Sequence, residues 1–197
     1  MATVIFDFDS TLINCESLEE ILKSKGVSPD KFESITKEGM DGKIPFDESL
    51  KKRLYLASLT REDFKSFGVR ALNYLTPQID TLIKSLQEKG VEVWIISGSF
   101  KDAIYPLAAK LNIPKNQVLA LEFEGPYLVK SKQAEGTNWN HPVVMVGDGM
   151  TDYELVESRM ADHFVIFTQH VKREAVMKKG EEAKSVDELK TILNHYV

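Results

Sequence analysis

The sequence predicts an α/β fold in which a parallel β-sheet is covered by helices on both faces. From residue 76 onward, apolar runs of strand length alternate with stretches that have helical spacing. A further apolar, β-branched and aromatic run stands at residues 3–8. Strands that alternate with helices form a parallel sheet, and the N-terminal strand must join it. We therefore expect a Rossmann-like, doubly wound sheet.

The segment from residue 15 to 75 is predicted to be helical throughout. Apolar residues recur at helical spacing in Glu16–Lys25 and again in Phe46–Leu59. Because this segment has no strand of its own, we expect it to form a helical cap inserted after the first strand. Residues 1–14 and 76–197 would then form the core domain.

Local sequence patterns predict the helices and strands from residue 76 onward. A stretch that alternates and contains Gly-Pro predicts a hairpin, and a Ser-x-x-Glu capping box predicts the start of the last helix. The expected elements are, in order, a helix at Ile79–Lys89, a strand at Val91–Ile96, a helix at Phe100–Leu111, a hairpin within Val118–Val129, a strand at Val143–Val146, a helix at Thr151–Arg159, a strand at Phe164–Phe167 and a helix from Ser185.

Composition limits the function classes. Of 197 residues, 43% are hydrophobic and 28% charged, as in ordinary globular proteins. The net charge is -5 without a long basic run, so we expect neither a nucleic-acid partner nor a membrane surface. Cys15 is the only cysteine, which excludes an internal disulfide. Because the N-terminal apolar run is short and interrupted by acids, we expect no signal peptide or anchor and a cytoplasmic location.

Acidic residues follow two of the predicted strands. Asp7 and Asp9 end the first strand and could serve in a turn; alternatively they form an oxygen-rich site for a hard cation, with one carboxylate free to attack an electrophile. Asp148 directly follows a later strand, and Asp152 stands four residues on, where it could merely favour the helix dipole. Parallel strands place their carboxyl ends at one edge. These carboxylates are therefore the expected ligands of Mg²⁺.

A third strand ends in Ser97-Gly98-Ser99, directly before a helix. Alone, this is often just a turn, but backbone amides at a helix N-terminus can cradle a phosphate. A carboxylate nucleophile, Mg²⁺ and phosphate-binding amides together make up a phosphoryl-transfer site. We therefore expect an enzyme that handles a phosphoryl group.

These motifs resemble those of the haloacid dehalogenase-like phosphatases. The resemblance implies that Asp7 is a nucleophile that becomes an aspartyl-phosphate, that Asp9 is the general acid and base, and that Ser97 holds the phosphoryl group. The metal ligands it implies are Asp7, Asp9 through its carbonyl, and Asp148, with Asp152 in support. The phosphate contacts extend to Gly98 and Thr151.

The chain is further similar to the phosphoserine phosphatase family over most of its length. That family has a glutamate soon after the aspartate pair, matched by Glu16, and a spaced cap pattern matched by Met40, Gly42, Phe46 and Arg53. The resemblance implies that the glutamate meets the substrate ammonium and the arginine meets its carboxylate, a pairing that suits a guanidinium fork. Met40 and Phe46 are expected to shield the site.

Two departures from the family pattern stand out. The family's lysine before the last acidic motif is displaced, and we expect Lys132 to replace it, with Lys130 behind it. Ser99 stands where the family usually has a second glycine. The expected function is Mg²⁺-dependent hydrolysis of O-phosphoserine, a small phosphorylated metabolite. The alternatives are another small phosphomonoester as substrate, or a catalytically weak relative that binds ligands.

Overall fold

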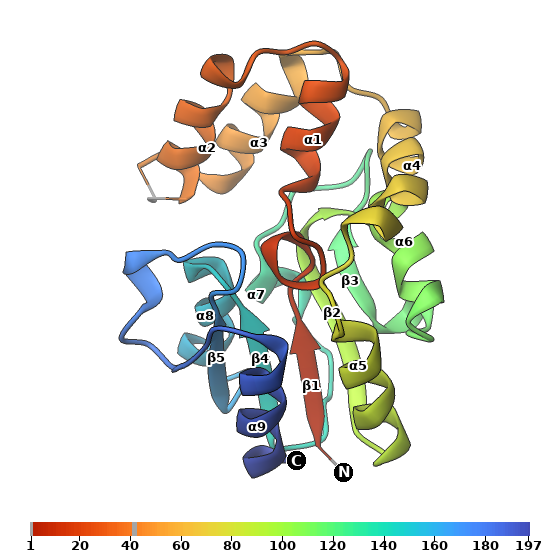
Figure 1. Cartoon of the computed structure of the whole chain (residues 1–197). Coiled ribbons are helices and arrows are strands. Elements are labelled where there is room, and N and C mark those ends of the chain that lie inside the picture. Colours follow the sequence, from red (N-terminus) through yellow and green to blue (C-terminus); the bar gives the residue numbers. More distant parts are fainter. Residues whose placement is uncertain (1, 41–42) are drawn as a thin grey trace.

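The structure is a computed structural model that describes residues 2–40 and 43–197, and of Met40 the backbone alone. Figure 1 shows a lower part, which is a sheet flanked by helices, and an upper group of helices that stands over one edge of the sheet. Both chain termini lie at the opposite, lower edge. The predicted combination of an α/β core and helices above it is therefore seen directly.

A fully parallel sheet forms the centre of the lower part. Its six strands follow the order β3-β2-β1-β4-β5-β6, and every neighbouring pair is parallel. The strands are β1 (Thr3–Phe6), β2 (Glu92–Phe100), β3 (Val118–Leu121), β4 (Val143–Gly147), β5 (His163–Phe167) and β6 (Glu181–Ala183). This order reverses direction at β1, which confirms the predicted doubly wound sheet and places the switch point beside that strand.

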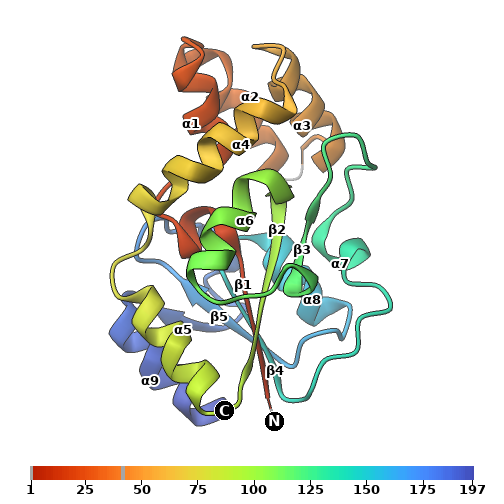
Figure 2. The same ribbon diagram turned by 90° about the vertical axis from the view of Figure 1, so that its right-hand side faces the viewer.

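Helices cover both faces, because the strands are apolar on both. In β1, Val4 and Phe6 belong to one buried cluster, whereas Ile5 belongs to the other. The helices of the first cluster are α5 (Ile79–Glu88), α6 (Lys101–Lys110) and α9 (Val186–Tyr196), and those on the second side are α7 (Lys130–Gln133) and α8 (Met150–Glu157). Figure 2 shows α5 and α9 on one side of the sheet and α8 on the other. Continuous apolar strands of this kind are typical of sheets buried on both faces.

The upper group consists of helices between β1 and α5. They are α1 (Ser17–Ser24), α2 (Glu33–Met40), α3 (Phe46–Tyr55) and α4 (Arg61–Arg70). Their inward side chains, among them Ile21, Leu50 and Phe64, are buried. All four fall in residues 15–75, and we propose this segment as the cap domain.

The chain passes between the core and the cap through two segments that lie side by side. Asn14 N donates to Tyr74 O at 2.8 Å, and Thr76 N donates to Leu12 O at 2.9 Å. The Thr76 hydroxyl also donates to Thr11 O at 2.7 Å. The cap therefore joins the core at the end of β1, close to the residues that follow this strand.

The helices begin and end where the sequence provides caps. Thr60 and Asp63 form the capping box of α4, and the Ser185 hydroxyl accepts from Glu188 N at the start of α9. Gly26 follows α1 with a φ of 77°, which a side chain would disfavour. No helix within residues 2–40 and 43–197 combines the length and the apolar composition needed to cross a membrane.

One expectation about the sheet was wrong, and one strand was not predicted. Residues 118–129 do not form a hairpin: β3 ends at Leu121 and pairs in parallel with β2, and the chain then turns, with Gly125 N donating to Glu122 O. The Glu122 carboxylate bonds Lys101 at the start of α6 instead of entering a second strand. The short edge strand β6 was not predicted, because its three residues carry two glutamates and resemble a loop.

Candidate active site

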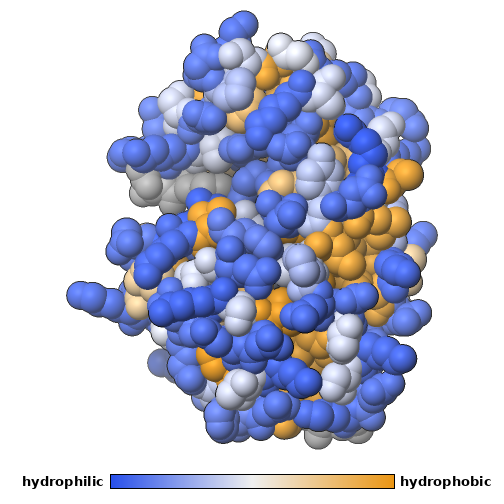
Figure 3. All heavy atoms as spheres, in the orientation of Figure 1, coloured by the Kyte–Doolittle hydropathy of each residue, from blue (hydrophilic) through white to orange (hydrophobic). Residues whose placement is uncertain are grey.

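A pocket lies at the carboxyl edge of the sheet, beneath the cap helices. Its volume is about 140 Å³, and Figure 3 shows that the surface is hollowed between cap and core. The residues singled out from the sequence that line it are Asp7, Asp9, Glu16, Phe46, Arg53, Ser97, Gly98, Asp148, Thr151 and Asp152. Segments far apart in the sequence thus converge on one site. The prediction for the Met40 side chain, like that for Gly42, lies outside what the structure describes.

Asp7 is the first residue beyond β1 and lies at the floor of the pocket. Its backbone N–H still belongs to the sheet, donating to Val146 O at 2.9 Å, and its Oδ1 accepts from Phe8 N at 2.7 Å. Burial raises the pKa of this carboxyl well above its usual range, against the opposing effect of Lys130. The sheet therefore holds this carboxyl in a water-poor position, and the Lys130 ammonium beside it favours the ionised form that a nucleophile requires.

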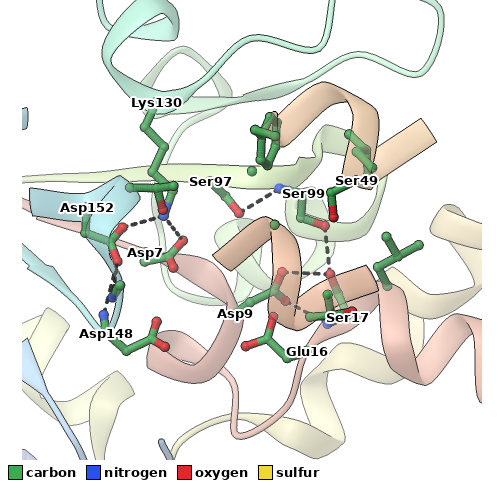
Figure 4. Close-up of a pocket in the computed structure, with 18 of the residues that line it drawn as sticks. Asp7, Asp9, Glu16, Ser17, Ser49, Ser97, Ser99, Lys130, Asp148 and Asp152 are labelled. Atoms are coloured by element: carbon green, nitrogen blue, oxygen red, sulfur yellow. Dashed lines mark hydrogen bonds and ion pairs between the residues drawn. The ribbon is translucent and has the colours of Figure 1, made fainter. Parts of the chain in front are cut away.

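Lys130, and not Lys132, is the lysine of the site. The Lys130 Nζ lies 2.7 Å from Asp7 Oδ1 and also bonds Asp152, in a position that is only 4% exposed (Figure 4). Although burial opposes its charge, Asp152 and Asp7 together raise its pKa. Lys132 instead pairs with Glu135 on the surface. The expectation for Lys132 is corrected: residues two apart on a helix point in different directions, and Lys130 is the one that faces the sheet edge.

Asp9 faces the first cap helix. Its Oδ1 accepts from Ser17 N at 2.8 Å, and its Oδ2 accepts from the Ser17 hydroxyl at 3.0 Å. Burial, reinforced by the nearby Glu16 charge, raises the pKa of Asp9 to about 8. A carboxyl with such a pKa carries its proton at neutral pH and can deliver it, which is the property of a general acid.

Ser97 and Gly98 lie at the end of β2, before α6. The Ser97 Oγ accepts from Ser99 N at 3.0 Å, and its side chain is 1% exposed. Gly98 faces the cap: a Cβ there would lie 3.1 Å from the Phe46 ring. Glycine at this position therefore allows the cap to approach the loop closely, and the loop can present its hydroxyl and amides to a phosphoryl group.

Asp148 and Asp152 complete the acidic end of the pocket. The Asp152 Oδ2 accepts from the backbone N–H groups of Asp148 and Gly149 at 3.1 and 2.9 Å, which fixes the turn after β4. Gly147 is required there, because a Cβ would overlap the Asp152 carboxylate. Burial raises the pKa of Asp148 to about 7, against the opposing effect of Arg173.

The acids fit a metal ion. Single carboxylate oxygens of Asp7, Asp148 and Asp152 lie within 4.8 Å of one another. The pKa values of Asp7, Asp9 and Asp148 are all raised by burial, which means that the site disfavours the negative charge it holds. A bound divalent cation would relieve this, and oxygen ligands are what Mg²⁺ prefers.

Arg173 was not predicted. It follows β5, and its Nε lies 2.6 Å from Asp148 Oδ2 while its Nη2 lies 3.0 Å from Glu16 Oε1. A signal was present, since this arginine comes shortly after a strand that ends at the same sheet edge. The pattern of acids and hydroxyls at strand ends does not include such an arginine.

The cap supplies the other end of the pocket. Glu16 accepts from the Ser10 hydroxyl at 2.8 Å, in addition to Arg173. Arg53 lies on α3 with its Nε donating to Ser49 O at 3.3 Å, and burial lowers its pKa. A guanidinium whose charge is disfavoured by burial would be stabilised by an incoming carboxylate. Thr36 and Ser49 also line this end and were not predicted.

Comparisons with known proteins agree with this geometry. A family model described as haloacid dehalogenase-like hydrolase matches residues 1–157. The phosphoserine phosphatase of Bos taurus is 34% identical over 197 positions, which cover 90% of this chain and 86% of the bovine protein. A phosphoserine phosphohydrolase-like protein from Francisella tularensis has a TM-score of 0.87 at 38% identity, covering 98% of this chain and 100% of that one. A substrate-bound phosphoserine phosphatase has a TM-score of 0.76 at 27% identity, covering 100% and 98%.

Proposed function

Because the chain belongs to the haloacid dehalogenase-like hydrolases and, within them, to the phosphoserine phosphatases, we propose that it hydrolyses O-phosphoserine to serine and inorganic phosphate with Mg²⁺ as cofactor. It is a phosphoric monoester hydrolase. The observation that carries the proposal is the pairing of a buried Asp7 with Lys130 at 2.7 Å, in the same pocket as Glu16 and Arg53 of the cap.

In the first step, an Asp7 carboxylate oxygen attacks phosphorus, and the bond from phosphorus to the serine oxygen breaks. The Asp9 carboxyl gives its proton to that oxygen, so that serine leaves as a neutral alcohol. Asp7 now carries the phosphoryl group as an aspartyl-phosphate. Ser97, the amide of Gly98, Thr151 and the Lys130 ammonium hold the phosphoryl oxygens.

In the second step, water attacks the phosphorus of the aspartyl-phosphate. Asp9, now a carboxylate, takes one proton from this water, and the remaining hydroxyl goes to phosphorus. The bond between phosphorus and the Asp7 oxygen breaks, which releases inorganic phosphate and restores both aspartates. Lys130 lies against Asp7 throughout and offsets the charge that develops there.

The acidic residues would hold the metal ion. Asp7, Asp148 and the Asp9 carbonyl are the proposed ligands, with Asp152 in support through its bonds to the Asp148 and Gly149 amides. When bound, Mg²⁺ supplies a Lewis acid that draws charge from the phosphoryl oxygens.

The cap would select the leaving group. Glu16 is proposed to bind the ammonium of phosphoserine and Arg53 its carboxylate, while Phe46 and Met40 shield the reacting atoms from water. A planar guanidinium can donate two parallel hydrogen bonds to the two oxygens of a carboxylate, whereas an ammonium acts as a point charge. The alternative of a catalytically weak relative depended on a missing lysine, and Lys130 removes that reason.

The test is phosphate release from a panel of phosphomonoesters by the metal-stripped protein, with and without added Mg²⁺. The panel contains phosphoserine, phosphoethanolamine, phosphoglycerate and p-nitrophenyl phosphate. We expect release to require the metal and kcat/KM to be highest for phosphoserine. Equal turnover of phosphoserine and phosphoethanolamine would instead favour another small phosphomonoester as substrate.

A further inference from the structure

Both oxygens of the Asp9 carboxyl are held by one residue of the cap. Ser17 begins α1, and it donates its backbone N–H to Oδ1 at 2.8 Å and its hydroxyl to Oδ2 at 3.0 Å. Ser17 is fully buried. The orientation of the Asp9 carboxyl is therefore set by Ser17, a residue of the proposed cap domain.

Ser99 lies behind Ser17 and continues the chain of hydroxyls. The two Oγ atoms are 2.8 Å apart, and the Ser99 side chain is only 5% exposed (Figure 4). An ionised carboxylate can only accept, so the Ser17 proton points at Asp9 when that residue is charged. The Ser99 hydroxyl must then be the donor to Ser17. In this ionised state, in which Asp9 acts as the base of the second step, the Ser99 hydroxyl donates to Ser17 and the Ser17 hydroxyl donates to Asp9.

The position of Ser99 is itself fixed by the phosphate loop. It lies on β2, in the core, and its backbone N–H donates to Ser97 Oγ at 3.0 Å. The hydroxyl of Ser99 thus ties the loop that would hold the phosphoryl group to the cap helix that holds Asp9. A glycine at this position, as in the family pattern, would lack this contact.

We propose that Ser99 is a positioning residue: acting through Ser17, it keeps the Asp9 carboxyl aligned with the leaving oxygen of the substrate. This inference rests on the proposed function, in which Asp9 is the general acid. Without the Ser99 hydroxyl, that of Ser17 can rotate away from Asp9 Oδ2, and protonation of the leaving oxygen becomes less efficient.

The consequence depends on the leaving group. A serine or phenol leaving group needs a proton in the first step, whereas p-nitrophenolate is stable enough to leave without one. kcat/KM reports only the steps up to formation of the aspartyl-phosphate. Hydrolysis of this intermediate therefore does not affect the comparison of kcat/KM among the three substrates. A defect in Asp9 alignment therefore appears as a steeper dependence of kcat/KM on leaving-group acidity.

The experiment measures kcat/KM for phosphoserine, phenyl phosphate and p-nitrophenyl phosphate in wild type, Ser99→Ala, Ser99→Gly, Ser17→Ala and the double variant Ser17→Ala/Ser99→Ala. One hydrogen bond contributes a modest free energy, so we expect Ser99→Ala to lower kcat/KM about three- to tenfold for phosphoserine and phenyl phosphate. For p-nitrophenyl phosphate, kcat/KM should fall less than about twofold. Since Ser99 acts through Ser17, the double variant should match Ser17→Ala alone.

Ser24→Ala is the matched control, because it removes a hydroxyl that bonds Ile21 O in the same helix, outside the pocket. Equal losses on all three substrates in both Ser99 variants, or losses that multiply in the double variant, would overturn the proposal while leaving the phosphatase assignment intact. If wild type releases phosphate from none of the substrates, the proposed function fails and the positioning role fails with it.

Discussion

The two ends of the pocket are built differently. At the core end, Asp7, Ser97, Lys130, Asp148 and Asp152 are at most 6% exposed, and the four charged residues are joined by hydrogen bonds or ion pairs. At the cap end, the Glu16 side chain is 22% exposed, and Arg53 donates to a backbone carbonyl at 3.3 Å, near the charges of Glu16 and Glu19. The difference indicates that the groups we propose for the reaction are already in place in the free protein, whereas the groups we propose for substrate selection retain capacity for a ligand.

This contrast has a physical cause. Asp7 and Asp148 directly follow strands whose register is fixed by neighbours on both sides, as at Phe6, which pairs with Ile95 and Val146. Ser97 lies within β2, whereas Lys130 and Asp152 lie in the first turns of short helices and bond Asp7 and the Asp148 amide. The cap residues project from helices that meet the core through side chains and two connecting segments. Geometry is therefore determined more strictly at the phosphate end than at the leaving-group end.

The largest effect is expected for the nucleophile. Asp7→Asn keeps the shape of the side chain but cannot attack phosphorus, so we expect turnover of every substrate to fall by about 10⁴-fold or more. Steady-state phosphate release measures this, with Asp187→Asn on α9 as a matched control. Activity in Asp7→Asn within tenfold of wild type would remove this residue from its role at the core end.

The second prediction separates the two lysines. Lys130→Ala should lower kcat about 10²–10³-fold, because it removes a preorganised charge beside the attacking oxygen. Lys132→Ala should leave kcat unchanged, since its partner is Glu135 on the surface. Because Lys130 is buried, thermal unfolding is measured for both variants. Similar activity in the two folded variants would contradict the assignment of Lys130.

The sequence was sufficient to predict the acids and the hydroxyl of the core end, but not its lysine, because the signals of the former are local. A buried apolar run followed by an acid or a hydroxyl gives both the strand and the position of the functional group, as at Asp7, Ser97 and Asp148. Parallel topology then brings the strand ends together. The parallel sheet and the gathering of these residues at one edge could therefore be predicted without knowing any long-range contact, whereas the order of the strands could not.

The errors arose where a long-range contact decides the structure. The spacing of Lys130 and Lys132 shows that they cannot both face the site, but only the packing of α7 against the sheet decides which one does. Arg173 enters the site from a loop after β5, and although that strand ends at the site's edge of the sheet, only the structure connects this arginine with Asp148 and Glu16. Similarly, residues 118–129 alternate like a hairpin, yet only β3 forms within them.

The third prediction is smaller and concerns charge at the core end. Burial raises the pKa of Asp148 to about 7 and that of Asp9 to about 8. A raised pKa contributes stability that is complete below the usual carboxyl range and is lost as pH rises through the folded value. The metal-free protein should therefore lose thermal stability as pH rises from about 4, the usual carboxyl pKa, to about 8, by roughly 2–4 °C for each kcal/mol of unfolding free energy lost.

Added Mg²⁺ should reverse this loss, and it should raise the Tm more at pH 8 than at pH 6, because protons compete with the metal for the same carboxylates. Thermal unfolding across this pH range, with Mg²⁺ or with a chelator, provides the measurement. A metal-free Tm that rises with pH, or a Mg²⁺ effect that is larger at pH 6, would contradict the charge balance described for the core end.

The most direct test of the division between the two ends is the kcat/KM of wild type and Arg53→Ala on phosphoserine and on p-nitrophenyl phosphate. Losing one partner of a desolvated charge pair costs about 2–5 kcal/mol, so Arg53→Ala should lower phosphoserine hydrolysis tens- to thousands-fold and barely change that of the aryl phosphate. Arg53→Lys should recover little, because an ammonium cannot reproduce the guanidinium fork. If Arg53→Ala slows both substrates equally, the cap does not select phosphoserine through this residue, and the proposed roles of the two ends are wrong.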